Sequence, residues 1–317
     1  MSTTRSTSSA KLDYTVVGGR RIDRGMPQPR SVSLVLLNRG TKLDRIQLFR
    51  SLEGLKVDEV VSIEGPSATY DVENLAGRFA KTRFLLLNRD SSPGEQINVA
   101  MDEALGRYVY VVWNTITPGP IPPRIIERIK DERLLCVVPI MRNERSELIP
   151  TIQAPAFFRS RLRVVPVPPS KDGMPSLYPF DYVGMYDKER FLRTGGFDTE
   201  IETPYWQKID FGFRAHMWGE RIVCATSLRV SLKSRDVAED TTPDSSYSRF
   251  YLKNLSVRFN GDNGDLPRRK FPQFYLRTGG SLASSIQLFR RIRRWVSQNR
   301  FRFVQDARRV TELWEDV

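Results

Sequence analysis

Polar residues follow directly on four apolar runs in the first part of the chain, and together their side chains could bind a polar ligand. The four groups are Asn38-Arg39, Glu64-Gly65, Asn88-Arg89-Asp90 and Trp113-Asn114-Thr115. Ligands of open α/β sheets bind beyond the carboxyl ends of the strands. If the four runs are parallel strands, these amide, guanidinium and carboxylate groups meet at one edge of the sheet, and the sequence predicts a ligand site there.

The elements that would position these groups are strands that alternate with helices. Mostly apolar runs at 32–37, 57–63, 82–88 and 108–113 are typical of parallel strands buried on both faces. Segments with helical spacing are 41–52, 71–80, 93–105, 124–131 and 206–218. Further strands are expected at 134–140, 162–167 and 221–225. The alternation predicts right-handed crossovers and an α/β fold, with a mainly parallel mixed sheet and helices on both faces.

Composition excludes several classes of protein. Of the 317 residues, 40% are apolar and 27% are charged, which excludes disorder throughout the chain. The two cysteines, Cys136 and Cys224, stand in apolar runs and the single histidine is His216, so a disulfide framework and a multi-histidine metal centre are excluded. No apolar run approaches the roughly 18 residues of a membrane span, and the first residues do not resemble a secretory signal, so we expect a cytoplasmic protein.

The net charge of +13 lies in the two ends of the chain. Residues 1–30 carry six basic and two acidic residues, and residues 268–317 carry twelve and four, whereas residues 31–267 are nearly neutral. This distribution argues against nucleic-acid binding by the whole surface. It predicts a flexible basic N-terminal arm at 1–30, a globular domain at 31–267 and a basic helical extension at 268–317.

The extension has the pattern of a basic amphipathic helix. Its apolar face is formed by Ile286, Phe289, Ile292, Trp295 and Val296, and arginines flank that face. One interpretation is an anchor on an anionic membrane surface, which would make the protein peripheral on the inner face of a membrane. The other is a helix packed on the domain with a solvated basic face. Nucleic acid is a weaker third candidate, because no recognition module surrounds the arginines.

Several segments, in order, resemble the family-two glycosyltransferases of the GT-A fold. SVSLVLLNR (31–39) and VDEVVSIEG (57–65) resemble their first two strands, and SSPGEQINVAMDEALGRYVYVVWNT (91–115) resembles a helix and the strand that carries a metal-binding Asp-x-Asp. LRTGGFDTEIETPYWQKIDFGFRAHMWGERI (192–222) resembles the acceptor segment, with Gly-Gly-Phe-Asp and then Glu-Asp-x-Asp. The resemblance covers about 31–232. It implies a GT-A-like fold and transfer of a sugar from a nucleotide-diphosphate sugar to a glycan or lipid-linked acceptor.

The chain departs from this family where the family binds a metal. Trp113-Asn114-Thr115 stands at the Asp-x-Asp position, and Ser231 stands where a later metal-binding histidine is frequent. Mg²⁺ or Mn²⁺ needs hard carboxylate oxygens, so the resemblance implies a degenerate site, and a divalent metal is not expected. Lys208 stands at the position that usually supplies the general base. Cations would then hold the diphosphate, with Lys208, Lys233 and Arg235 as candidates.

The resemblance also implies roles for individual residues. The residues implied to bind the nucleotide sugar are Asn38, Arg39, Glu64, Asn98, Trp113, Asn114, Thr115 and Lys208. Asn98 would position loops beside the nucleotide, and Trp113 would either stack on a sugar or base or fill the place of the metal. Asp210 or Asp198 would deprotonate the acceptor hydroxyl in an inverting displacement.

Structural interpretations stand beside these roles. Asp210 could pair with Arg214 at i+4 on a helix, Asp198 could bond the backbone of its own turn, and Glu64 could be a solvated loop acid. His216 is better explained as a satisfied helix histidine. Loss of the metal ligands and of the base position leaves a second function open, a catalytically inactive GT-A domain that acts as a binding or scaffold subunit at the membrane surface.

Overall fold

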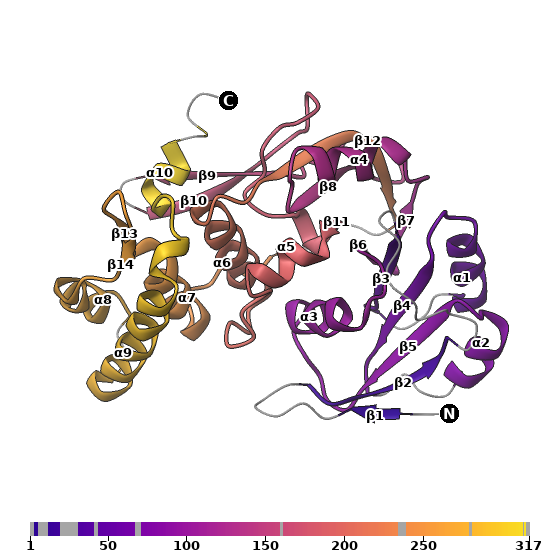
Figure 1. Cartoon of the computed structure of the whole chain (residues 1–317), viewed down its shortest axis with the longest axis horizontal. Coiled ribbons are helices and arrows are strands. Elements are labelled where there is room, and N and C mark those ends of the chain that lie inside the picture. The colour runs from indigo at the N-terminus through magenta and orange to yellow at the C-terminus, as the bar shows by residue number, and fades with distance from the viewer. Residues whose placement is uncertain are drawn as a thin grey trace.

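The chain is seen in a computed structural model. The residues it describes are 3–5, 12–19, 31–40, 44–66, 71–158, 161–233, 239–278, 281–312 and 314. They form a large mixed sheet with helices on both faces, next to a mainly helical region built from the last third of the chain (Figure 1). None of the helices among these residues is both long and apolar enough to cross a membrane.

Ten strands of the described chain form the central sheet, in the spatial order β1-β2-β5-β4-β3-β6-β11-β8-β12-β7. Their bounds are β1 Thr3–Arg5, β2 Tyr14–Gly18, β3 Val32–Leu37, β4 Glu59–Glu64, β5 Thr82–Leu87, β6 Tyr108–Trp113, β7 Ile116–Pro118, β8 Cys136–Arg142, β11 Gly184–Asp187 and β12 Ile222–Leu232. β5, β4, β3 and β6 are parallel, and β11 lies antiparallel between β6 and β8. The predicted mixed, mainly parallel sheet is confirmed.

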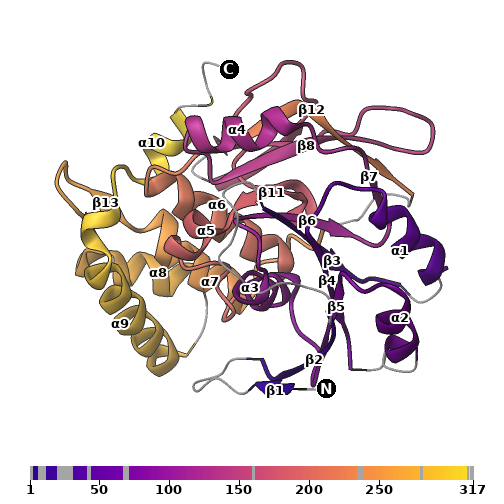
Figure 2. The same cartoon turned by 45° about the vertical axis from the view of Figure 1, so that its right-hand side comes forward.

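Helices cover both faces of the parallel strands because those strands are apolar on both sides. Every residue of β3 and β6 is buried. The helices of this part are α1 Arg45–Glu53, α2 Val72–Arg78, α3 Pro93–Glu103, α4 Pro123–Asp131, α5 Lys188–Arg193 and α6 Pro204–Met217. α1 and α2 lie on one side of the sheet and α3 lies on the other (Figures 1 and 2).

A second hydrophobic core lies beside the sheet and is shared by α6 and the C-terminal segments. The elements here are the hairpin β9 Ile152–Phe158 and β10 Arg161–Val167, α7 Ser245–Phe250 with a π-helical turn at Tyr251–Leu255, the short pair β13 Arg258–Phe259 and β14 Gly264–Asp265, α8 Phe271–Thr278, α9 Leu282–Gln298 and α10 Ala307–Glu312. Three 3₁₀ turns complete the described elements, at Phe180–Tyr182, Arg268–Lys270 and Arg300–Arg302. α6 joins the two cores, since Phe211 packs in the sheet core and Phe213 in the second.

The two ends of the chain contribute to these cores. Within the segment predicted as a flexible arm, β2 pairs with β5, and Leu12 is buried in the sheet core. In α9, Phe289, Ile292 and Val296 are buried in the second core. The apolar face that could have entered a membrane is therefore used inside the protein, as the packed-helix interpretation expects.

Candidate functional site

The predicted polar groups meet where β3, β4 and β6 end. Asn38 donates to the carbonyl oxygen of Ile63 at 2.8 Å and so ties the end of β3 to β4. Asn114 clamps the backbone of Arg39, since its Oδ1 accepts from the Arg39 N–H at 3.2 Å and its Nδ2 donates to the Arg39 carbonyl at 3.1 Å. Both side-chain amides therefore hold the backbone in place at this edge of the sheet.

Arg39 is the centre of a compact cluster at this edge. Its guanidinium lies 4.6 Å from the ring centroid of Trp113, donates from Nε to Thr115 Oγ1 at 3.0 Å and pairs from Nη1 with Asp181 Oδ2 at 2.6 Å. Its Nη2 is buried and has no hydrogen-bond partner among the described residues. Arg39 Nη2 is one of several such atoms among the described residues, and it keeps a donor for which a ligand oxygen could be the acceptor.

Asp181 and Tyr182 form a strained turn against this cluster. Their φ angles are +48° and +65°, a left-handed conformation that residues other than glycine rarely adopt. Trp113 Nε1 donates to the Asp181 carbonyl at 2.9 Å, and the Tyr182 hydroxyl contacts Gln207 Oε1 at 3.0 Å, so two neighbouring elements hold the turn in place. Such strain occurs mostly at functional sites. Nothing in the sequence around this turn signals it.

Two further charged residues, Lys208 and Glu239, lie beside the cluster and come from outside the sheet. Burial raises the pKa of Asp181 above its ordinary value, although Arg39 and Lys208 act in the opposite direction. Lys208, on α6, is almost fully buried, lies 5.3 Å from the ring centroid of Tyr182 and pairs with Glu239. The Glu239 side chain keeps 22% of its surface exposed. Sequence analysis missed Asp181 and Glu239, which come close to Arg39 and Lys208 only in the folded chain.

Glu64, at the end of β4, is buried and is not the solvated acid of the alternative interpretation. Arg45 pairs with its Oε1 at 2.7 Å, and Ser62 donates to the same oxygen at 2.7 Å. Burial raises the pKa of Glu64, and the Arg45 charge opposes that rise. The predicted group Asn88-Arg89-Asp90 is more exposed to solvent. The Arg89 side chain pairs with Glu95 and keeps 52% of its surface exposed.

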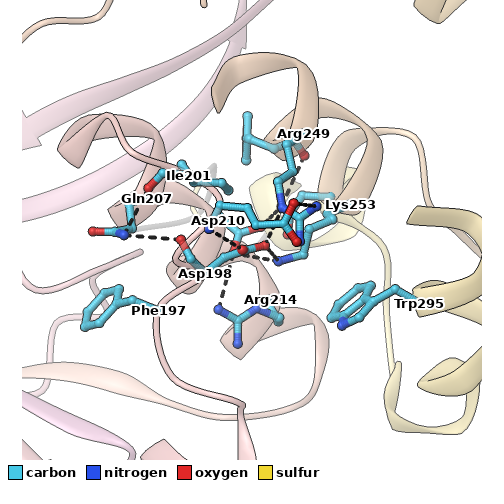
Figure 3. Close-up of polar contacts among 12 residues, drawn as sticks. Phe197, Asp198, Ile201, Gln207, Asp210, Arg214, Arg249, Lys253 and Trp295 are labelled. Atoms are coloured by element: carbon cyan, nitrogen blue, oxygen red, sulfur yellow. Dashed lines mark hydrogen bonds and ion pairs between the residues drawn. The ribbon is translucent and has the colours of Figure 1, made fainter. Parts of the chain in front are cut away.

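The two carboxylates predicted to be catalytic lie apart from this edge, in a buried charge network (Figure 3). Asp210 is fully buried, and its oxygens accept from Asn254 at 2.7 Å, Lys253 at 3.1 Å and Arg214 at 3.2 Å. Asp198 accepts from Lys253 at 2.6 Å and from Arg249 at 2.8 Å. Burial alone would raise the pKa of Asp198, but Lys253 and Arg249 together lower it far below its ordinary range. The catalytic role of either acid stays a prediction.

The same network explains why the Gly-Gly-Phe-Asp segment and Arg214 occur together in this chain. Arg214 donates to the carbonyl oxygens of Thr194 and Gly196, on either side of a left-handed turn. Asn98 reaches the turn from α3, donating to the Phe197 carbonyl at 2.8 Å and accepting from its N–H at 2.9 Å. Asn98 therefore holds the Gly-Gly-Phe-Asp segment, whereas the sequence analysis placed its effect beside the nucleotide.

The remaining predicted residues have simpler surroundings. The backbone N–H of Lys233 donates to the Thr115 carbonyl at 2.9 Å, which brings this exposed residue to the same edge. Arg235 lies outside the described residues. His216 is buried, and burial lowers its pKa to about 4, while its Nε2 lies 3.0 Å from the Ser176 carbonyl oxygen. Because a carbonyl oxygen only accepts, Nε2 carries the proton and His216 is a satisfied helix histidine.

The described residues at this edge do not form a set of ligands that fits a divalent cation. The position that the resemblance assigns to Asp-x-Asp carries Trp113, Asn114 and Thr115, and the nearby Asp181 already pairs with Arg39. Among the described residues, no three His, Cys, Asp or Glu side chains gather in a way that could hold a metal ion. Hard cations in proteins are bound mainly by several carboxylate oxygens.

Comparison with known proteins identifies the fold. No protein-family model matches the chain, and no curated protein matches its sequence. GalNAc-T7, solved with UDP, GalNAc and Mn²⁺, is similar over 87% of this chain and 58% of its own, with 12% sequence identity and a TM-score of 0.52. S. aureus TarS 1–349 in complex with UDP-GlcNAc is similar over 83% of this chain and 71% of its own, with 12% identity and a TM-score of 0.49. The chain thus has a GT-A-type fold and spans less than two thirds of the GalNAc-T7 structure.

Proposed function

We propose that the chain binds a nucleotide-diphosphate sugar at the carboxyl edge of its sheet and transfers the sugar to a hydroxyl of a glycan or lipid-linked acceptor. The displacement is inverting and uses no divalent metal. The observation that carries this proposal is the Arg39 cluster, a guanidinium held at the ends of β3 and β6 where the family resemblance implies metal ligands. The proposal includes the finer assignment, a family-two-like chain with a degenerate Asp-x-Asp segment.

Arg39 and Lys208 supply the positive charge for the diphosphate. Asp181 and Thr115 hold the Arg39 guanidinium in one orientation, and its unpartnered Nη2 remains for a phosphate oxygen. Fixed donors of this kind stabilise charge that develops on a leaving group without having to reorganise. Glu64, Asn38 and Asn114 shape the neighbouring part of the edge, where the nucleoside lies.

The transfer step needs a base for the acceptor hydroxyl. The hydroxyl proton passes to a carboxylate, the acceptor oxygen bonds to the anomeric carbon, and the bond from that carbon to the diphosphate oxygen breaks. The bonding pair leaves with the nucleoside diphosphate, whose added charge is balanced by Arg39 and Lys208. We assign the base to Glu239, because it is partly exposed beside Lys208, whereas Asp210 is fully buried and Asp198 is held by two cations.

One observation favours a second function, a catalytically inactive domain that binds a nucleotide sugar as part of a larger assembly. Lys208 stands at the usual base position, and Glu239 is tied to it in an ion pair. In that case the donor binds at the same edge, but no sugar is transferred. Binding without turnover separates the two functions.

Calorimetry with UDP-, GDP- and dTDP-sugars tests the proposal, with a CMP-sugar as a ligand that lacks a diphosphate. Each is titrated in Mn²⁺ and in EDTA, with a product assay on the same samples. We expect one diphosphate sugar to bind equally in both conditions, and Arg39→Gln to weaken it about tenfold or more through loss of charge-assisted hydrogen bonds.

Arg124→Gln is the matched control, since Arg124 is exposed on α4 and has no ion pair among the described residues. Thermal melts show whether each variant is folded, and Arg39→Gln/Asp181→Asn removes both charges of the pair if the single variant unfolds. Binding that requires Mn²⁺ would contradict the metal-independent site, and absence of binding to every donor would contradict the donor site.

The membrane contact has a narrower basis than the sequence suggested. Because most of the apolar face of α9 is buried, its exposed arginines Arg290, Arg291 and Arg294 are the groups on this helix that would attract an anionic surface. For a lipid-linked acceptor, this attraction would bring the protein to the membrane without insertion. Flotation with anionic and neutral vesicles at low and high salt tests it, and equal recovery with both vesicles would contradict it.

A further inference from the structure

A groove of about 690 Å³ lies between β10, the start of α6, the loop at 241–243, α7 and α8. Its walls include Arg163 from β10, Tyr205 and Trp206 from α6, Tyr247 from α7 and Arg277 from α8. None of the roles described above uses this groove. It is built from segments that are far apart in the sequence.

Aromatic rings line one side of the groove. The centroids of Tyr205 and Trp206 are 4.8 Å apart, as are those of Trp206 and Tyr247. Trp206 Nε1 donates to the Thr242 carbonyl at 2.9 Å, which holds the loop that forms the rim. Rigid aromatic rings with a polar edge offer a flat apolar surface on which the C–H face of a sugar ring can pack.

The charge in the groove is entirely positive. Arg163 and Arg277 are exposed, and neither has an ion pair among the described residues. No acidic side chain occurs among the described residues that line the groove. A guanidinium fits carboxylate and phosphate groups through paired hydrogen bonds, so the groove is complementary to an anionic ligand.

The groove adjoins the groups that would carry out the transfer. Tyr205 and Lys208 are three residues apart on α6, and so they neighbour each other on its surface. Glu239 pairs with Lys208. Burial and, to a lesser extent, the charge of Glu239 raise the pKa of Tyr205 to about 12. A ligand bound along the aromatic wall would therefore place one end beside Glu239.

We propose that this groove binds the acceptor, and that the acceptor is a glycan carrying carboxylate or phosphate groups. Its sugar rings pack on the partly exposed rings of Tyr205 and Tyr247, its anionic groups pair with Arg163 and Arg277, and its terminal hydroxyl faces Glu239. The proposal rests on the transferase function and specifies the class of acceptor for the same site.

Binding measurements on the full chain test the proposal with three probes of equal length. Hexagalacturonate carries carboxylates, maltohexaose is neutral, and a phosphorylated maltohexaose distinguishes phosphate from carboxylate. Each is titrated into wild type, Arg163→Gln, Arg277→Gln, the double variant and the control Arg124→Gln. We expect at least one anionic hexamer to bind about tenfold or more tightly than maltohexaose, and each groove variant to lose about fivefold, while Arg124→Gln binds as wild type does.

Several results would overturn the proposal. These are equal binding of neutral and anionic hexamers, no binding of any hexamer, or a loss in Arg124→Gln as large as in the groove variants. Tighter binding of a single-stranded dT20 oligonucleotide or of anionic vesicles, with the same dependence on Arg163 and Arg277, would assign the groove to a different partner. Donor titrations on the same samples keep the two proposals apart, because intact donor binding without anionic-glycan binding contradicts the acceptor groove alone.

Discussion

Two charge clusters in this molecule use the same residue types but differ in access to solvent. At the sheet edge, the paired side chains of Arg39 and Asp181 keep 23% and 10% of their surface exposed. Around Asp210, the side chains of Arg214 and Lys253 keep 3%, and Asp210 itself keeps none. Both Asp210 oxygens accept hydrogen bonds, and each cluster contains a buried guanidinium nitrogen with no hydrogen-bond partner among the described residues, Nη2 of Arg39 in the first and Nε of Arg214 in the second. The two clusters therefore differ in exposure.

The difference indicates separate tasks for the two clusters. Removing one partner from a buried ion pair leaves an uncompensated charge, so a network such as that around Asp210 holds the segments it joins. Arg214, Asp210 and Lys253 connect the glycine turn before Asp198, α6 and the π-helical turn. A partly open cluster next to a strained turn is suited to bind. The acids that the family resemblance implicates are the more buried ones, whereas the base that we propose, Glu239, keeps 22% of its side chain exposed.

The largest effect is expected from Asp210→Asn, and it separates the two clusters most directly. The change leaves Arg214 without a buried counter-charge and Lys253 with Asp198 alone, and we expect the free energy of unfolding to fall by about 3–5 kcal/mol. Urea unfolding measures it. Arg193→Gln, which breaks the exposed Arg193–Glu189 pair, is the control, and we expect it to leave stability nearly unchanged because solvent screens exposed pairs. A stable Asp210→Asn protein that binds donor but has lost turnover would instead make Asp210 catalytic.

His216, which is buried on α6 and uncharged, should make the stability of the protein depend on pH. Its folded pKa of about 4 lies below the ordinary value of 6.5. Between pH 6.5 and pH 4, this histidine binds a proton in the unfolded chain but stays neutral in the folded chain. The free energy of unfolding therefore falls as pH falls from 6.5 toward 4, by up to roughly 3 kcal/mol at the low end. Urea unfolding of His216→Gln across this window should show a weaker pH dependence than wild type, and an unchanged slope would contradict this assignment.

Glu239→Gln tests the open cluster for chemistry. The variant keeps the size of the side chain but cannot accept the acceptor proton, so we expect turnover to fall by about a hundredfold or more with little change in donor affinity. Product assays with the donor found by calorimetry measure it, beside Asp240→Asn, which alters an exposed neighbour. Unchanged turnover in Glu239→Gln would remove Glu239 as the base.

The smallest effect is expected from Arg39→Lys, which keeps the charge but not the fork of donors. The single ammonium group of a lysine cannot bind Thr115 and Asp181 and also offer a nitrogen to the ligand. We therefore expect the affinity for the nucleotide-sugar donor to fall about tenfold, with thermal stability nearly unchanged. Titration calorimetry measures the affinity. Equal affinity in the lysine variant would mean that Arg39 acts only as a point charge.

Much of the fold follows from local pattern. Apolar runs buried on both faces predict the parallel strands, and β3 and β6 lie where the runs at 32–37 and 108–113 place them. Asn38, Arg39, Asn114 and Thr115 meet at one edge because parallel strands end on the same side. The hairpin of β9 and β10 was only half predicted, since the segment at 152–158 contains a proline and lacks regular alternation.

What the sequence alone determined about this protein is its class of fold, the edge of the sheet at which the predicted polar groups meet and the concentration of positive charge at the two ends of the chain. Only the tertiary structure decided which charged groups are partners. Asp181 approaches Arg39 across 142 positions of the chain, Lys253 approaches Asp198 across 55, and the apolar face of α9 packs in the second core instead of a membrane. The physical reason is that periodicity reports which side of an element is buried, whereas pairing between distant side chains depends on how the elements pack.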